Sequence, residues 1–173
     1  PDQFSVLGLS MFASSLDKEQ INEIILKLLK NLDFDLLLYR YFDDEKLVKS
    51  MNKKYDPFIN EFNKLFNIKL KIIKGLTKNN NNSLDKQLFK KSILKFNNFY
   101  LTALFKLSGI SKSVILSYFF LNKRILSKKL FELSNIESIY QQKNWGLVDE
   151  QKKINDNYLE SIKNISNFFK NIS

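Results

Sequence analysis

Cysteine and histidine are both missing from this 173-residue sequence. Without cysteine the chain forms no disulfide, which fits a reducing compartment. Without either residue it lacks the usual soft ligands for zinc, iron and copper, and Ser–His and Cys–His nucleophile pairs are excluded. Two large groups of metal-binding and catalytic proteins are therefore ruled out.

Glycine is also scarce, with only Gly8, Gly75, Gly109 and Gly146 in the chain. These positions are too far apart to form a glycine-rich loop that cradles phosphates. We therefore expect no nucleotide, no other cofactor and no metal, and we expect the protein not to be an enzyme.

Two acidic clusters are the nearest approach to a catalytic constellation. Asp33 and Asp35 flank Phe34, and residues 43–45 form an Asp-Asp-Glu run. Paired carboxylates can bind hard cations or act as acid and base. Neighbouring residues on a helix do not face one another, so we interpret both clusters as helix caps and solvated charge.

Arginine is rare in a chain that is strongly basic. Of the 28 basic residues only Arg40 and Arg124 are arginine, and the net charge is +10. Such a charge favours nucleic acid, anionic lipid or an acidic protein as a partner. Arginine is the preferred bidentate phosphate ligand, however, and a lysine excess with many Asn and Ile is typical of AT-rich genomes. Charge alone therefore does not select one of these partners.

Apolar residues are plentiful but never form a long run. They make up 44% of the chain, including 16 Phe, which is enough for a folded core. The longest apolar stretches, such as residues 114–121, are far shorter than the about 20 residues that span a bilayer. The start of the chain shows no secretory signal. We expect a single folded unit without membrane insertion.

Helical periodicity dominates the first half of the chain. Apolar residues follow Asp17 at three- and four-residue spacing, and Asp17 with Gln20 predicts a capping box. They are Ile21, Ile24, Ile25, Leu28, Leu29 and Leu32. Residues 33–40 are apolar on most sides and predict a buried helix. Asp56-Pro57 predicts the start of the next helix, because Asp caps free amides and Pro is tolerated in a first turn.

The second half continues the pattern. Ser83 is expected to cap a helix that ends at Gly109, and Ser111 to start another that is apolar nearly all round and therefore central. A helix capped by Ser127 is expected to end near Trp145-Gly146. The last helix carries apolar residues at close to heptad spacing, which are Ile154, Tyr158, Ile162, Ile165, Phe169 and Ile172.

A two-residue period occurs only at residues 68–73, where Ile68, Leu70 and Ile72 alternate with lysine. This segment predicts a short edge strand that lysines protect from unwanted pairing. We therefore predict an all-α fold, an orthogonal helical bundle with at most one short strand or hairpin.

The segment 134–146 stands out because it holds the single Trp beside a glycine. Tyr and Trp anchor interfaces, since they combine a large area with a polar group. Tyr140 and Trp145 therefore predict either a binding surface or core aromatics next to a helix-ending glycine.

Four blocks of the sequence resemble, in order, an assembly chaperone family that captures the α subunit of the ATP synthase catalytic head. Asp33 to Arg40 is similar to its Asp, two-leucine, Tyr-Arg block, and Asp56-Pro57 to its Asp-Pro block. Residues 107–116 resemble its central small-residue and aliphatic helix. The most specific block is the last, with Ile136-Glu137, Tyr140-Gln141 and Trp145-Gly146 at the family's spacing.

This resemblance implies an ATP12-type chaperone of mitochondria and alphaproteobacteria. It would bind the unassembled α subunit and shield the apolar surface that later meets the β subunit, acting as a monomer without a cofactor. Its compartment would be the bacterial cytoplasm, which we favour, or the mitochondrial matrix in a eukaryote. The family's N-terminal β-rich domain is not recognisable here, so we expect residues 1–16 to be a tail from that domain and residues 17–173 to be the helical chaperone domain.

The family pattern also assigns residues. We predict a partner-binding site at Glu137, Tyr140, Gln141 and Trp145, in which Glu137 and Gln141 share one face of a helix. Ser138 replaces the second of two adjacent acidic residues in the family, which leaves Glu137 to carry the acidic role. Structural roles are expected for the remaining motif residues, Tyr39, Arg40, Asp56, Pro57, Gly109 and Gly146.

Two other hypotheses remain open. The net charge of +10 is compatible with a basic helical nucleic-acid-binding module, whose binding would fall steeply with salt. The lysine-rich last helix is compatible with a peripheral membrane module, which liposome flotation would detect.

Overall fold

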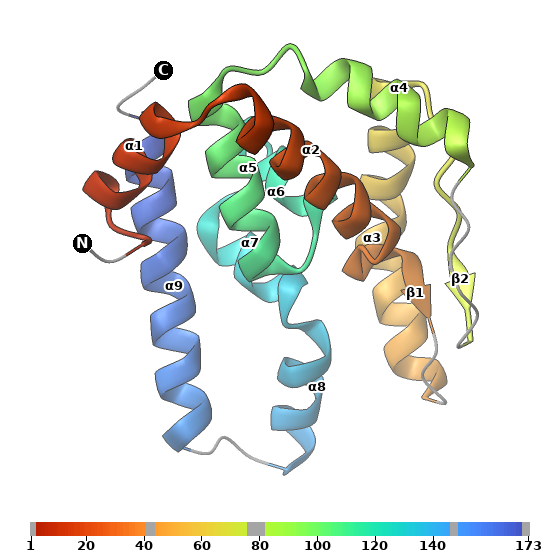
Figure 1. The fold of residues 1–173 in the computed structure, drawn as a ribbon. Helices are drawn as coiled ribbons and strands as arrows, with labels where there is room; N and C mark the ends of the chain where they lie inside the picture. Colours follow the sequence, from red (N-terminus) through yellow and green to blue (C-terminus); the bar gives the residue numbers. More distant parts are fainter. Residues whose placement is uncertain (1–2, 41–43, 76–81, 146–148, 171–173) are drawn as a thin grey trace.

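Nine α-helices and one small sheet form the described part of this computed structural model, which comprises residues 3–40, 44–75, 82–145 and 149–170 (Figure 1). The side chains of residues 144, 145, 149 and 150 lie outside the description. The predicted all-α class is confirmed. The helices are α1 (Val6–Ser15), α2 (Lys18–Asp33), α3 (Glu45–Phe66), α4 (Ser83–Ile93), α5 (Asn98–Ser111), α6 (Val114–Leu121), α7 (Ser127–Ser134), α8 (Ile136–Trp145) and α9 (Asp149–Lys170).

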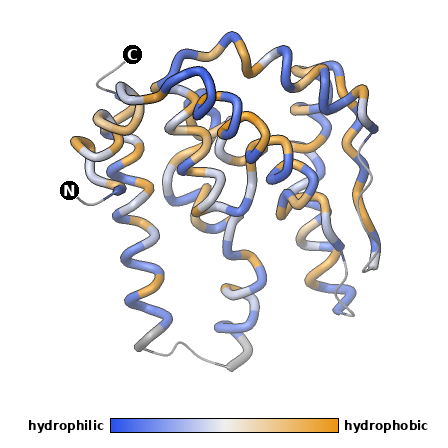
Figure 2. The backbone as a smooth tube through the Cα atoms, viewed as in Figure 1, coloured by the Kyte–Doolittle hydropathy of each residue, from blue (hydrophilic) through white to orange (hydrophobic). Residues whose placement is uncertain are grey.

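Helix α6 lies at the centre of the bundle, as its sequence predicts. All of its residues except Tyr118 are buried, because a helix that is apolar on every side has no face to offer to water. Helix α5 packs along α6 and also contacts α1, α2, α7 and α9. Figure 2 shows frequent hydrophilic positions along the part of α9 that projects away from these central helices.

Helix α2 begins as the sequence predicts. The backbone amide of Gln20 donates to Asp17 Oδ1 at 2.8 Å. The backbone amide of Asp17 donates to Gln20 Oε1 at 3.0 Å, which completes the capping box. The apolar face of α2 is buried through Ile24, Ile25, Leu28 and Leu32.

The prediction of a buried helix over residues 33–40 is wrong. Helix α2 ends at Asp33, a single 3-10 turn covers Leu36–Leu38, and strand β1 (Tyr39–Arg40) pairs in parallel with β2 (Ile73–Lys74). The buried Asp35 carboxylate explains the break, because it accepts from the Leu37 amide at 3.0 Å and from the Ile115 amide of α6 at 3.1 Å. A side chain that bonds backbone amides in this way competes with helix continuation.

Of the strand expected at residues 68–73, only Ile73 belongs to a strand, β2. Ile68, Leu70 and Ile73 are buried, whereas Ile72 is 39% exposed. The backbone before β2 forms hydrogen bonds with the side chain of Asn63 and not with another strand. Asn63 accepts from the Leu70 amide at 3.0 Å and donates to the Leu70 carbonyl at 3.1 Å.

Asp56-Pro57 does not start a helix, which is a second correction. Both residues lie inside α3, whose N-cap is Asp44. Apolar side chains are buried at three- and four-residue spacing along the whole of α3, from Leu47 to Phe66. This burial keeps the helix continuous across Pro57, which is exposed.

The predicted helix from Ser83 to Gly109 is two helices. Helix α4 ends at Ile93, and Asn97 caps α5 by accepting from the Tyr100 amide at 2.8 Å. Gly109 lies within α5 instead of ending it, and Ser111 ends that helix instead of starting the next. The chain reverses at Lys112, which adopts the left-handed conformation with φ 56°.

Two helices at the ends of the described chain lie against each other and against α5. Residues 6–15, part of the segment expected to be a tail, form α1, which buries Leu9 and Ala13 in the common core. Helix α9 buries Ile162, Ile165 and Phe168, whereas Ile154 of the predicted apolar face is 54% exposed. Ile172 lies outside the described residues. No helix in the described ranges is long and apolar enough to cross a membrane.

Candidate partner-binding site

All four predicted site residues lie on α8, a short helix that extends from the bundle beside α3 (Figure 1). The sequence predicted one helix from Ser127 to Trp145, but the chain breaks at Asn135 into α7 and α8. The Asn135 side chain donates to the Phe131 carbonyl at 2.9 Å and so occupies a helical acceptor. The break lets α8 take a different direction from α7.

Two hydrogen bonds join α3 to this region. The Tyr55 hydroxyl donates to the Leu133 carbonyl in the last turn of α7 at 2.6 Å. The Tyr140 hydroxyl of α8 donates to Asp44 Oδ2 at 2.8 Å. Because position 55 meets 133 and position 44 meets 140, α3 runs antiparallel to the α7–α8 segment.

Asp44 serves two elements at once. Its Oδ1 accepts from the Lys46 and Leu47 amides at 2.9 and 3.1 Å, which caps α3, while Oδ2 accepts from Tyr140. The hydrogen bond from Tyr140, followed by those from the capped amides, lowers the pKa of Asp44. The ionised carboxylate therefore holds the start of α3 and the middle of α8 together.

Glu137 and Gln141 share the face of α8 that their four-residue spacing predicts. Gln141 Nε2 donates to Glu137 Oε1 at 3.2 Å, so the polar pair bonds internally and not to neighbouring backbone. Gln141 is exposed, Glu137 is half-buried, and Tyr140 packs its ring against the core. Trp145 is the last residue of α8, and its side chain, like Gly146, is outside the described part of the chain.

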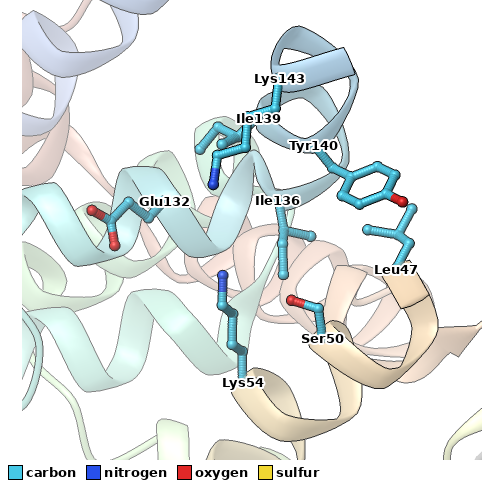
Figure 3. A pocket seen from close by; sticks show the side chains of 8 residues that line it. All are labelled: Leu47, Ser50, Lys54, Glu132, Ile136, Ile139, Tyr140 and Lys143. Carbon is cyan, nitrogen blue, oxygen red and sulfur yellow. The ribbon is translucent and has the colours of Figure 1, made fainter.

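A groove of about 460 Å³ opens between α3, α7 and α8, on the side of α8 that carries Tyr140 (Figure 3). Its lining combines apolar and polar side chains from all three helices. They are Leu47, Ser50 and Lys54 from α3, Glu132 from α7, and Ile136, Ile139, Tyr140 and Lys143 from α8. We call this feature the α3–α8 groove.

Sequence reasoning identified Tyr140 but missed the rest of this groove. The α3 wall was hidden because Asp56-Pro57 was interpreted as a helix start, which excluded residues 47–54 from the helix. The available signal was the spacing of Leu47, Met51 and Tyr55, which continues the apolar period toward the N-terminus.

The motif residue Arg40 of β1 contacts the motif residue Asp56 of α3. Arg40 Nη2 donates to Asp56 Oδ1 at 3.0 Å, Nε donates to Asn52 Oδ1 at 2.8 Å, and the guanidinium lies 5.1 Å from the centre of the Tyr55 ring. The Tyr39 hydroxyl donates to the Asp33 carbonyl at 3.0 Å. Burial lowers the pKa of Arg40, and Asp56 opposes that shift. This cluster positions Tyr55, and through it the α7–α8 junction.

Asp33 and Asp35, whose carboxylates could have formed a cation or acid–base site, instead bond to a lysine and to backbone amides. Asp33 forms an ion pair with Lys86, and Asp35 accepts from backbone amides. Burial raises the pKa of Asp35 to about 6. Among the described residues no group of three or more His, Cys, Asp or Glu could hold a metal ion. Asp33 and Asp35 therefore serve ion pairing and backbone capping.

No protein-family model and no curated protein matches this sequence. Solved structures do share its fold. Atp12 from Paracoccus denitrificans superposes with a TM-score of 0.83 and 23% identity, covering 91% of this chain and 68% of its own. A point mutant of that protein gives a TM-score of 0.86 and 23% identity, covering 95% and 71%.

A proposed chaperone from Agrobacterium tumefaciens superposes with a TM-score of 0.89 and 16% identity, covering 100% of this chain and 65% of its own. The chain thus spans about two thirds of the length of these proteins. At such identities the likeness shows the fold. The resemblance to the ATP12-type family is confirmed at that level.

Proposed function

We propose that the protein is an assembly chaperone of the F-type ATP synthase catalytic head, which binds the unassembled α subunit and shields its apolar interface until the β subunit pairs with it. The observation that carries this proposal is the shared fold with Atp12 and a proposed chaperone over 91 to 100% of the chain. It acts without catalysis or a cofactor, as a monomer, in the bacterial cytoplasm or the mitochondrial matrix.

The physical need for such a protein is clear. An unpaired subunit exposes a large apolar interface, and surfaces of that kind aggregate. A holding protein must compete with aggregation and still release its partner, which a modest and partly polar contact allows.

The exposed face of α8 suits that exchange. Glu137 and Gln141 offer a carboxylate and an amide, which can make directional contacts with a partner at modest desolvation cost. Tyr140 contributes aromatic area beside them, and Trp145 extends the same surface in this proposal. With Ser138 in place of the family's second acid, Glu137 supplies the acidic contact.

The test is the double substitution Glu137→Lys with Gln141→Ala, read out by thermal melting and by capture of separately produced α subunit. Gln141 is exposed, and the half-buried Glu137 bonds to Gln141, so we expect melting to stay near wild type while capture is lost. Glu160→Lys on the exposed face of α9 makes the same charge change elsewhere and is expected to leave capture intact.

Capture at the wild-type level by the double variant would remove α8 from the binding surface. A large fall in the melting temperature would instead assign Glu137 and Gln141 a structural role. If the wild-type chain captures no α subunit but binds a single-stranded oligonucleotide with a steep salt dependence, the competing nucleic-acid-binding hypothesis is correct.

A further inference from the structure

The arrangement of the residues that line the α3–α8 groove suits a bound helix. Leu47, Ser50 and Lys54 are spaced along one face of α3, and Ile136, Tyr140 and Lys143 along one face of α8. Each face covers eight residues, with a rise of about 10 Å or two helical turns from the first to the last. The hydrogen bond from Tyr140 to Asp44 joins α8 to the start of α3, and the one from Tyr55 to Leu133 joins α3 to α7.

The apolar part of the groove extends from Ile136 to Leu47 and Tyr140, on the side away from Glu132 (Figure 3). Leu47 and Ile136 are 4% and 6% exposed, and Ile139 and the Tyr140 ring are half-buried beside them. Ile139 and the Tyr140 ring are therefore the apolar side chains that a bound protein segment could cover.

The charged side chains of the groove are unbalanced. Lys54 from α3 and Lys143 from α8 both extend toward the space between the walls, with Glu132 at the α7 side (Figure 3). Neither lysine forms an ion pair with any residue in the described ranges. Two ammonium groups facing one space are complemented by a carboxylate placed between them.

We infer that the α3–α8 groove binds a short amphipathic helical segment of the captured protein, with its apolar side against Ile139 and the Tyr140 ring and an Asp or Glu side chain between Lys54 and Lys143. This inference rests on the proposed function and specifies the chemistry of its partner. It adds the α3 wall to the contact predicted from Glu137, Tyr140, Gln141 and Trp145.

The first experiment compares charge variants of the whole chain in capture of the ATP synthase α subunit. Lys54→Glu with Lys143→Glu is expected to weaken capture at least roughly tenfold, and Lys54→Arg with Lys143→Arg to retain it. Lys91→Glu with Lys95→Glu changes two exposed lysines outside the groove and is the matched control for charge. Helical circular dichroism and thermal melting verify that each variant is folded.

The second experiment uses short overlapping peptides that cover the α subunit. Wild-type protein is expected to bind peptides with apolar residues at helical spacing next to an Asp or Glu. Replacing that acid by its amide should weaken binding to wild-type protein roughly tenfold, and should change little for Lys54→Gln with Lys143→Gln. Additive losses would overturn the inference, because the acid would then contact another part of the protein.

The outcomes separate the two proposals. If wild-type protein captures no α subunit, the proposed function fails and the inference fails with it. If the charge-reversed variant captures the α subunit as well as wild type does, the inference is overturned and the proposed function stands. Loss of oligonucleotide or phosphatidylglycerol-vesicle binding in that variant, with unchanged peptide binding, would also overturn it.

Discussion

The two arginines of the chain occupy opposite environments. The Arg40 side chain is 1% exposed and donates four hydrogen bonds, to Leu37, Tyr39, Asn52 and Asp56. Arg124 is 63% exposed and pairs with Glu61 at 3.3 Å. A planar guanidinium can satisfy four acceptors in fixed directions, whereas an ammonium group on a flexible stem cannot.

Arg40→Lys is therefore expected to lower the free energy of unfolding by about 2 to 3 kcal/mol, because buried acceptors lose their donors. Arg124→Lys, the matched control at the surface, should cost less than about 0.5 kcal/mol. Chemical denaturation of both variants measures the difference. Equal effects at the two positions would contradict a structural role for the Arg40 cluster.

Asp35 is expected to make stability depend on pH. Its folded pKa of about 6 lies above the ordinary aspartate value of 3.8, so its contribution to stability is fully present below pH 3.8 and is lost as the pH rises through 6. The loss is on the order of 2 to 3 kcal/mol. The stability of the wild type relative to Asp35→Asn should fall by that amount between acidic and neutral pH, as measured by denaturation across the range. Parallel pH profiles would refute the prediction.

At the scale of elements, α3 contains an unfavourable residue that its packing tolerates. Pro57 has no amide hydrogen and so removes a helical hydrogen bond, yet α3 continues because its opposite face is buried. Pro57→Ala is expected to raise the free energy of unfolding by about 1 to 3 kcal/mol, reduced somewhat by the greater freedom of the unfolded chain.

The comparison for Pro57→Ala is Asn60→Ala on the same exposed side of α3, which should gain no more than about 0.5 kcal/mol. Denaturation curves of the two variants measure the two changes in the free energy of unfolding. A loss of stability in Pro57→Ala would mean that Pro57 has a favourable packing role.

Helix α8 depends on a single hydroxyl for its attachment to the cap of α3. Tyr140→Phe removes the hydrogen bond to Asp44 and keeps the aromatic area. We expect a stability loss of about 1 kcal/mol and faster amide hydrogen exchange both in α8 and in the first turn of α3. Tyr100→Phe, which removes a hydrogen bond to Asn122, is the control and should leave α8 unchanged. Unaltered exchange in α8 would show that other contacts hold it.

The sequence was sufficient for the class of fold and for the central helix, because both follow from apolar periodicity. It was insufficient at residues 33–40, 94–97 and 135. There the side chains of Asp35, Asn97 and Asn135 bond backbone groups and interrupt patterns that look continuous. For Asp35 the partner includes an amide of α6, which only tertiary packing brings near.

The candidate site divides in the same way. The shared face of Glu137 and Gln141 follows from helical geometry and was predictable. The α3–α8 groove was not, because its second wall belongs to a helix far earlier in the chain. No local pattern indicates that Lys54 and Lys143 approach one space.

At the scale of the whole molecule, the net charge of +10 opposes the compact state through self-repulsion. Salt screens that repulsion, with a Debye length of about 8 Å at about 0.15 M. The melting temperature is therefore expected to rise by a few degrees as NaCl increases from about 0.01 M to about 0.15 M. Differential scanning calorimetry provides the measurement. A fall would mean that attractive ion pairs outweigh the repulsion.

The small parallel sheet has a consequence for how any partner is recognised. In the described ranges its strands are two residues long, and the extended chain before β2 is closed by the amide group of Asn63. An aggregation-prone chain commonly attaches by adding a strand to a free sheet edge, where backbone groups bind any sequence. The residues that the structure describes offer almost no such edge, so a protein bound to them would be selected by its side chains and would not seed a growing sheet there.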